Sequence, residues 1–194
     1  MNHLEQLVSE WLQYKGYFVR VSIPVGPRPL GGFEGELDVV AVHPGRRHLI
    51  HVECSLDALS DAQRQPRFAA KFERGRKFVP EVLKGLDLPG EIDQVAVLQF
   101  ASGRVRNIGG ARLVTVRELV VEIRQGLAGT SPASGAISAN LPLLRTLQLA
   151  ADAFDRPAGQ APGLVGTARG SSAWRGSVNR LQLSVPSHWM DSMP

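Results

Sequence analysis

Two strongly apolar segments, residues 36–43 and 48–55, constrain the fold of this chain more than any other feature. Each has the length and composition of one β-strand, and the Pro-Gly pair between them is typical of a tight turn. Each segment carries a carboxylate, Asp38 near the start of the first and Glu53 near the end of the second. Burying a carboxylate is costly unless it is paired or binds a cation. The hairpin therefore predicts an oxygen-lined site for a hard divalent cation, with two neighbouring strands each supplying one acid.

The remaining periodicity predicts how this hairpin is covered. Helical spacing of apolar residues, or runs of β-formers, predict the following elements: helix 3–15, strand 17–25, strands 35–43 and 48–55, helix 66–83 with Pro66 in its first turn, strand 94–100, strand 112–116, and helix 117–127. This order predicts an α/β fold in which helices flank a mixed central sheet.

The chain of 194 residues suits one domain with an appendage. We expect an α/β core at residues 1–128, then a linker and accessory helix at 129–154. Residues 155–194 are rich in Gly, Pro, Ser and Arg and lack a patterned apolar face, so we expect a flexible C-terminal tail.

The order of these acidic motifs resembles the PD-(D/E)XK nuclease superfamily, which has the restriction endonuclease-like fold. That family has a Glu on its first helix, an Asp on a strand, and (D/E)-x-K on the next strand, which Glu5, Asp38 and Glu53 match. The resemblance implies a Mg²⁺- or Mn²⁺-dependent endonuclease that hydrolyses DNA phosphodiester bonds. It also implies that Glu5, Asp38 and Glu53 hold the metal, with the backbone carbonyl of Cys54 as a further ligand.

The chain departs from the family motif at one position, because Ser55 stands where the Lys is expected. Some families of this superfamily relocate the Lys to the following helix. On that helix, Lys71 falls at the border of the apolar stripe and Lys77 on the solvent side. We therefore predict Lys71 as the third catalytic residue beside Asp38 and Glu53. The alternative is a surface Lys whose alkyl stem covers Phe68.

Basic residues are dense between positions 64 and 84, and the whole chain has a net charge of +4. A basic helix face attracts the phosphate backbone of DNA. The predicted nucleic-acid contacts are Arg64, Arg67, Lys71 and Arg74. The alternative is a solvated helix face that nearby acids partly neutralise.

Two rival functions remain open. The first is a catalytically inactive member of the same fold that acts as a nucleic-acid- or protein-binding module; the missing Lys favours it, and the retained acids favour the enzyme. The second is an adaptor unrelated to DNA whose tail contacts a protein partner. A homodimer also stays open.

Other chemistries have weaker support. Cys54 is the only cysteine, which excludes an intrachain disulfide and favours a reducing, cytoplasmic location. Cys54 and His51 fall on opposite faces of their strand, so they are poorly placed as a nucleophile and base. Zinc ligands and a phosphate-binding loop lack the required spacing. We expect no membrane association, because no apolar run is long enough to span a bilayer.

Overall fold

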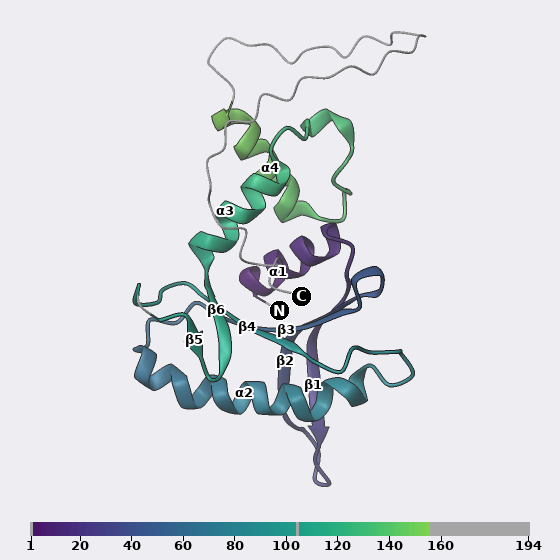
Figure 1. Cartoon of the computed structure of the whole chain (residues 1–194), viewed down its shortest axis with the longest axis vertical. Helices are drawn as coiled ribbons and strands as arrows, with labels where there is room; N and C mark the ends of the chain where they lie inside the picture. The colour runs from purple at the N-terminus through teal and green to yellow at the C-terminus, as the bar shows by residue number, and fades with distance from the viewer. Residues whose placement is uncertain (1, 104, 156–194) are drawn as a thin grey trace. The chain divides into compact units, whose positions relative to one another are not determined.

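A computed structural model of the chain describes residues 2–103 and 105–155 and shows an α/β fold (Figure 1). The strands are β1 (Phe18–Pro27), β2 (Phe33–His43), β3 (His48–Ser55), β4 (Asp93–Leu98), β5 (Asn107–Ile108) and β6 (Ala111–Thr115). The helices are α1 (His3–Tyr14), α2 (Asp61–Val82), α3 (Val116–Leu127) and α4 (Pro142–Asp155), with short 3-10 turns at Pro44–Arg46 and Pro132–Ser134.

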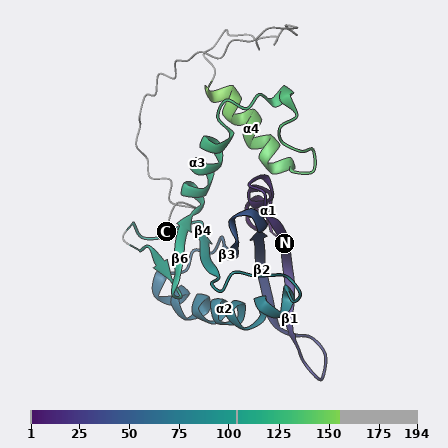
Figure 2. The same ribbon diagram turned by 45° about the vertical axis from the view of Figure 1, so that its right-hand side comes forward.

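The strands form one mixed sheet in the order β1-β2-β3-β4-β6-β5. Neighbours β1, β2 and β3 are antiparallel, whereas β3, β4 and β6 run parallel to one another. A parallel pair needs a crossover connection, and α2 makes the crossover from β3 to β4. Helix α2 covers one face of the sheet and α1 the other (Figures 1 and 2). The mixed sheet flanked by helices confirms the predicted fold class.

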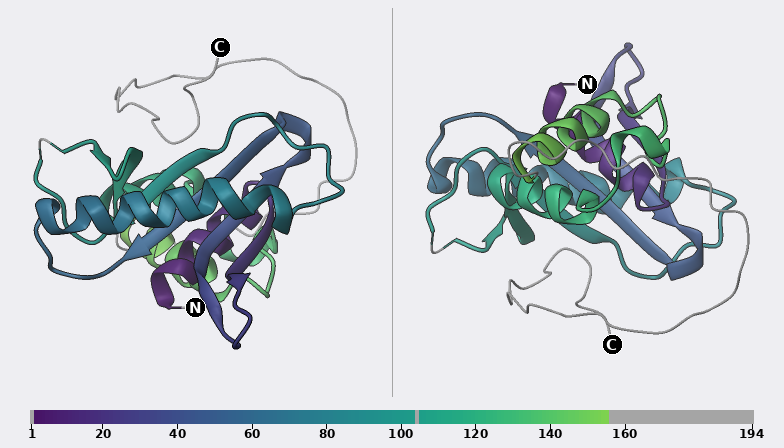
Figure 3. Two further views of the ribbon diagram at one scale, coloured as in Figure 1. Left: turned by 90° about the horizontal axis from the view of Figure 1, so that it is seen from below. Right: turned by 90° about the horizontal axis from the view of Figure 1, so that it is seen from above.

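The core lies on both sides of this sheet. Under α2, one apolar cluster joins its C-terminal half to β1, β2 and β3, and a second joins its N-terminal half to β4, β5 and β6. On the opposite face, Trp11 of α1 is fully buried and donates a hydrogen bond from its indole N–H to Glu122 of α3. The view from below in Figure 3 shows α2 running across the sheet strands. Helix α2 therefore packs against both β2 and β3, the two strands that carry Asp38 and Glu53.

The predicted start of α2 at Pro66 is wrong, because the helix begins at Asp61. Ser60 is its N-cap, and Ser60 and Gln63 form a capping box that satisfies the first free N–H groups of the helix. Pro66 therefore lies inside the helix rather than in its first turn. The predicted strand 94–100 ends earlier, at Leu98, and the two-residue strand β5 was not predicted.

The segment predicted as a linker and accessory helix contains the 3-10 turn Pro132–Ser134 and helix α4. The backbone N–H of Leu144 donates to the buried carboxylate of Glu10 at 3.0 Å, which ties the start of α4 to α1. The predicted flexible tail lies outside the described residues, which end at Asp155. Between residues 2 and 155, residue 104 apart, we find no helix with both the length and the apolar character needed to cross a membrane.

Candidate active site

Asp38 lies at an irregular point of strand β2. Leu37 and Val40 are three residues apart yet belong to the same cluster under α2, so the two-residue alternation of the strand is interrupted between them. In the neighbouring strand, Ser22 has a φ of 48° and makes no ladder pair with Asp38, although the pairs on either side are intact. The carboxylate Oδ2 of Asp38 accepts the backbone N–H of Cys54 at 2.8 Å. The acid thus takes the place of a backbone acceptor at the end of the β2–β3 ladder.

Glu53 is fully buried on β3, on the face that α2 covers. Its Oε1 lies 2.8 Å from Nε2 of His51, which precedes it by two residues on the same face of the strand. His51 is also fully buried, and its ring packs edge-on against Phe72 of α2 at a centroid distance of 5.7 Å. Glu53 therefore has one oxygen fixed by its own strand, and the other directed toward the helix.

Lys71 of α2 completes the cluster. Its Nζ lies 2.6 Å from Oε2 of Glu53 and 3.2 Å from Oδ2 of Asp38. One third of its side chain is exposed, and Nζ lies 5.8 Å from the centre of the Phe68 ring. The structure thus brings together the three residues that the sequence proposed as catalytic. Lys77, expected on the solvent side, is 60% exposed and pairs with Glu34 instead.

The three groups shift one another's protonation. Burial and the adjacent charge of Glu53 raise the pKa of Asp38 to about 7, although Lys71 and the Cys54 N–H work in the opposite direction. Burial alone would raise the pKa of Glu53, but the His51 hydrogen bond and the Lys71 charge hold it below its usual value. Burial disfavours the charged ammonium, yet the two carboxylates outweigh this and raise the pKa of Lys71. The cluster thus combines the charged pair of Glu53 and Lys71 with an Asp38 whose pKa lies near neutrality.

Glu5 is near this cluster but is held by a different set of contacts. It forms the capping box of α1 with Asn2 and accepts hydrogen bonds from that residue. Its charge, together with those of Asp38 and Glu53, raises the pKa of the buried Cys54 thiol, on which burial acts most strongly. In the described part of the chain, no three His, Cys, Asp or Glu side chains come close enough together to hold a metal ion. The metal ligand set Glu5, Asp38 and Glu53 is therefore not assembled in this conformation, and the Cys54 carbonyl stays a prediction.

The residues that are present nevertheless fit a hard divalent cation. Asp38 and Glu53 offer carboxylate oxygens, which Mg²⁺ and Mn²⁺ prefer over nitrogen or sulfur. Burial and the neighbouring charge of Glu53 both raise the pKa of Asp38, and a cation beside the two carboxylates would favour its ionised form. Mg²⁺ commonly binds through one or two carboxylates and keeps several waters or phosphate oxygens as its other ligands. Asp38 and Glu53 are thus the two residues that would hold the ion.

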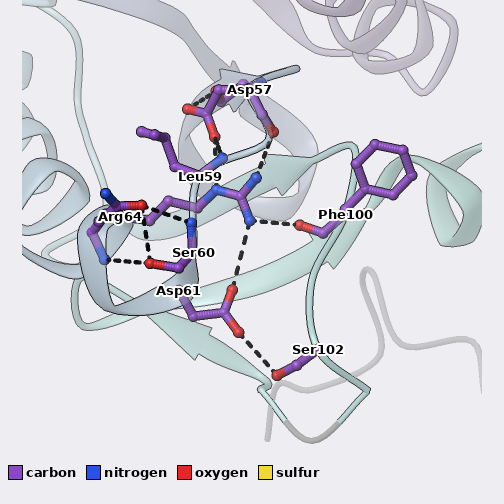
Figure 4. Close-up of polar contacts among 9 residues, drawn as sticks. Asp57, Leu59, Ser60, Asp61, Arg64, Phe100 and Ser102 are labelled. Carbon is purple, nitrogen blue, oxygen red and sulfur yellow. Dashed lines mark hydrogen bonds and ion pairs between the residues drawn. The ribbon is translucent and has the colours of Figure 1, made fainter.

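Arg64 is buried, which is incompatible with its predicted role as a DNA contact. Its side chain is only 2% exposed. Nε donates to Asp57 at 2.8 Å, Nη1 donates to the carbonyl of Phe100 at 2.8 Å, and Asp61 lies within ion-pair distance (Figure 4). The guanidinium thus joins the β3–α2 connection to the segment after β4. The prediction that Arg64 contacts phosphate is wrong, because the group is enclosed by the protein's own acceptors.

Ser55 belongs to the same structural unit. Its hydroxyl donates to Oδ2 of Asp57 at 2.6 Å, and Asp57 in turn binds Arg64. The position that carries the motif Lys in the resembling family is therefore used here to shape the loop that leads into α2. No charged group reaches the acids from this position.

Two other predicted DNA contacts lie on the same edge of α2 as Lys71. Arg67 precedes Lys71 by one helical turn and is exposed, and Arg74 follows it by three residues and is half-buried. The side chain of Arg74 passes close over Gly35 of β2, where a Cβ would collide with the guanidinium. This edge of α2 thus presents three cations in a row beside the two acids.

Sequence reasoning missed the partners of the cluster. His51 was considered as a base for Cys54 and as a zinc ligand, but not as a partner of Glu53, although the two residues share one strand face. Gln94, the second residue of β4, contacts His51 from the neighbouring strand. That contact depends on the parallel pairing of β3 and β4, which local sequence does not reveal.

Comparisons with known proteins add little to this description. No protein-family model matches the chain, and no curated protein matches it. Among solved structures, the chain is similar to the crystal structure of the protein of unknown function AF1548. That similarity has a TM-score of 0.39 and 10% sequence identity, and it covers 78% of this chain and 96% of that chain. A similarity at this level identifies neither a family nor an activity, so function is argued below from the geometry of the site.

Proposed function

We propose that the chain is a Mg²⁺- or Mn²⁺-dependent endonuclease of the PD-(D/E)XK type that hydrolyses DNA phosphodiester bonds. One observation supports this above all: Nζ of Lys71 lies 2.6 Å from Glu53 and 3.2 Å from Asp38. The motif Lys is absent from β3, and a Lys from α2 reaches the same acids instead. Two buried acids and one partly exposed amine, drawn from three elements, match the groups that this chemistry requires.

Each residue has a distinct part in the proposed reaction. A bound divalent ion would supply an activated water and neutralise charge on the phosphate. Asp38 and Glu53, the two carboxylates that contact Lys71, would hold the ion. Lys71 keeps a positive charge next to those oxygens, where it would orient the attacking water or stabilise the extra negative charge of the transition state. Asp38 would hold the ion in its ionised form.

The choice of DNA as substrate rests on charge. Arg67 and Arg74 flank Lys71 along α2 and would contact backbone phosphates on either side of the bond that is cut. Contacts of this kind are independent of base sequence. We therefore expect binding that weakens steeply with added salt and shows little sequence preference.

A specific observation also favours the inactive binding module. The ammonium of Lys71 already bridges both carboxylates, as a structural ion pair would. Ser55, at the position of the motif Lys, carries no charge and donates its hydroxyl hydrogen to Asp57. In this alternative the cluster stabilises the contact between α2 and the sheet, and the basic edge of α2 binds nucleic acid without cutting it.

Substitution of Lys71 separates the two functions. Lys71→Ala should abolish Mg²⁺-dependent cleavage of labelled DNA, while DNA affinity changes little because one phosphate contact among several contributes only part of the binding. Lys77→Ala is the matched control: Lys77 lies on the same helix, pairs with Glu34 and stands away from the acids. It should cleave normally. Equal cleavage by the two variants would contradict a special role for Lys71 and support the binding module.

A further inference from the structure

A row of hydrogen bonds leads from the exposed Arg76 of α2 through Gln94 of β4 to the buried Glu53. Arg76 Nη1 donates to Oε1 of Gln94 at 2.6 Å. The amide nitrogen of Gln94 lies 2.8 Å from the carbonyl oxygen of Phe72 and 3.3 Å from Nδ1 of His51. Nε2 of His51 lies 2.8 Å from Oε1 of Glu53. The row ends at the carboxylate that the proposed function places on the metal.

The donors and acceptors in this row fix the protonation pattern of the His51 ring. A backbone carbonyl only accepts, so the NH₂ group of Gln94 must face Phe72. A guanidinium only donates, so the oxygen of Gln94 must face Arg76, which gives the same orientation of the amide. The NH₂ group therefore donates to Nδ1 of His51, and the ring hydrogen lies on Nε2. From there it donates to Glu53.

Packing holds the ring where these bonds need it. His51 is fully buried and lies edge-on to Phe72. Gly75 of α2 stands directly over the ring, and a Cβ at this position would collide with Nδ1 and Cε1 of His51. A glycine inside a helix costs stability relative to alanine, and here its lack of a side chain lets α2 lie against the imidazole. The ring is thus confined by the helix, the strand and the amide at once.

We infer that His51, oriented by Gln94, is a positioning residue that fixes Glu53 with Oε1 held inside the sheet and Oε2 presented to Lys71 and the divalent ion. This inference rests on the proposed function, because it assigns His51 a role toward that ion. Without the Nε2–H donor, Oε1 loses its hydrogen bond within β3, and the orientation of the Glu53 carboxylate then depends on its contact with Lys71. Hydrogen bonds that orient a ligating carboxylate commonly change metal affinity or activity by about 10–100-fold.

The first arm of the test uses the unmodified chain. Nitrogen-15 chemical shifts and couplings of the His51 ring report which nitrogen carries the hydrogen, in the absence of any metal. We expect the neutral form protonated at Nε2. A ring protonated at Nδ1 alone would overturn the inference, because Nε2 would then have no hydrogen to donate to Glu53.

The second arm measures Mn²⁺ affinity by calorimetry, together with melting temperature. His51→Phe keeps an aromatic ring without a donor, and Gly75→Ala pushes the ring out of place. Both should weaken Mn²⁺ binding roughly 10–100-fold. His51→Gln places an amide nitrogen near the position of Nε2 and should recover most of that affinity. Gly126→Ala is the matched control: a Cβ on this helix glycine of α3 would collide with Trp11, far from the row. It should lower the melting temperature and leave Mn²⁺ affinity unchanged.

The outcomes separate this inference from the proposed function. Mn²⁺ binding and DNA cleavage by the unmodified chain, with His51→Phe binding Mn²⁺ equally well, would overturn the positioning role alone. Neither binding nor cleavage by the unmodified chain would overturn the proposed function and, with it, the role of His51 toward an ion. If His51→Phe fails to fold, the ring tautomer of the unmodified chain still decides whether the donor exists.

Discussion

Nζ of Lys71 lies 2.6 Å from Oε2 of Glu53, although the two residues are 18 positions apart and belong to a helix and a strand. The amine therefore reaches Glu53 from above the sheet, not along its own strand. A Lys two residues after Glu53 would lie on the same strand face. Ser55 occupies that position instead, and it donates a hydrogen bond to Asp57 in the loop after β3. The charge at the acids and the shape of the loop are thus supplied by different residues.

The raised pKa of Asp38 predicts how stability changes with pH. The pKa of Asp38 is 3.8 in the unfolded chain and about 7 in the fold. The contribution of this carboxyl to the free energy of unfolding is therefore complete below pH 3.8, where it is protonated in both states. That contribution is lost as pH rises through 7. Asp38→Asn removes the charge, so it should raise the free energy of unfolding at pH 8 by as much as about 4 kcal/mol.

At pH 3, where Asp38 is protonated both in the fold and in the unfolded chain, the substitution should change little. Denaturant titrations of both proteins at the two pH values measure the difference. A variant that is less stable than the unmodified chain at pH 8 would contradict the electrostatic assignment.

Transfer of the amine back to the strand tests whether its position on α2 matters. Ser55→Lys in a Lys71→Ala background places an ammonium beside Glu53 from the strand side. It should restore Mg²⁺-dependent cleavage at least roughly tenfold over Lys71→Ala, because a positioned catalytic group contributes about 10²–10⁴-fold. Ser55→Met in the same background is the control for side-chain bulk. Recovery with Met as well as Lys would show that charge is not the cause.

Arg64 and Arg67 should respond in opposite ways to truncation. Arg64→Ala leaves Asp57 without its buried partner and should lower the free energy of unfolding by about 3 kcal/mol. Arg67→Ala changes an exposed side chain and should stay within about 0.5 kcal/mol of the unmodified chain. It should instead weaken DNA binding and reduce the salt dependence of log affinity by about one unit. Similar stabilities for the two variants would contradict the structural role of Arg64.

Sequence alone predicted the parts of this molecule that depend on local pattern. The hairpin of β2 and β3 was recoverable because apolar runs and a Pro-Gly pair are local signals. Lys71 was recoverable because helical spacing set it at the edge of the apolar stripe, although its catalytic role remains a prediction. The capping box of Ser60 and Gln63 was also present in the sequence and would have corrected the start of α2.

What could not be predicted depends on contacts between distant segments. Arg64 looked like part of a basic surface, and only the approach of the Phe100 carbonyl shows that it is enclosed. Gln94 meets His51 because β3 and β4 pair in parallel. The backbone of Ser22, at a φ of 48°, is distorted opposite Asp38, and nothing in its neighbouring sequence marks such a position. Each of these follows from tertiary packing, not from local propensity.

The central claim is that Asp38, Glu53 and Lys71 form a metal-dependent phosphodiesterase site, and the most direct measurement is cleavage of end-labelled DNA. The unmodified full-length chain and Glu53→Gln are incubated with duplex, branched and single-stranded DNA in Mg²⁺, in Mn²⁺ and in chelator. We predict cleavage of at least one substrate by the unmodified chain with metal, none in chelator, and none by Glu53→Gln. No cleavage by the unmodified chain in either metal, or equal cleavage by Glu53→Gln, would contradict the claim.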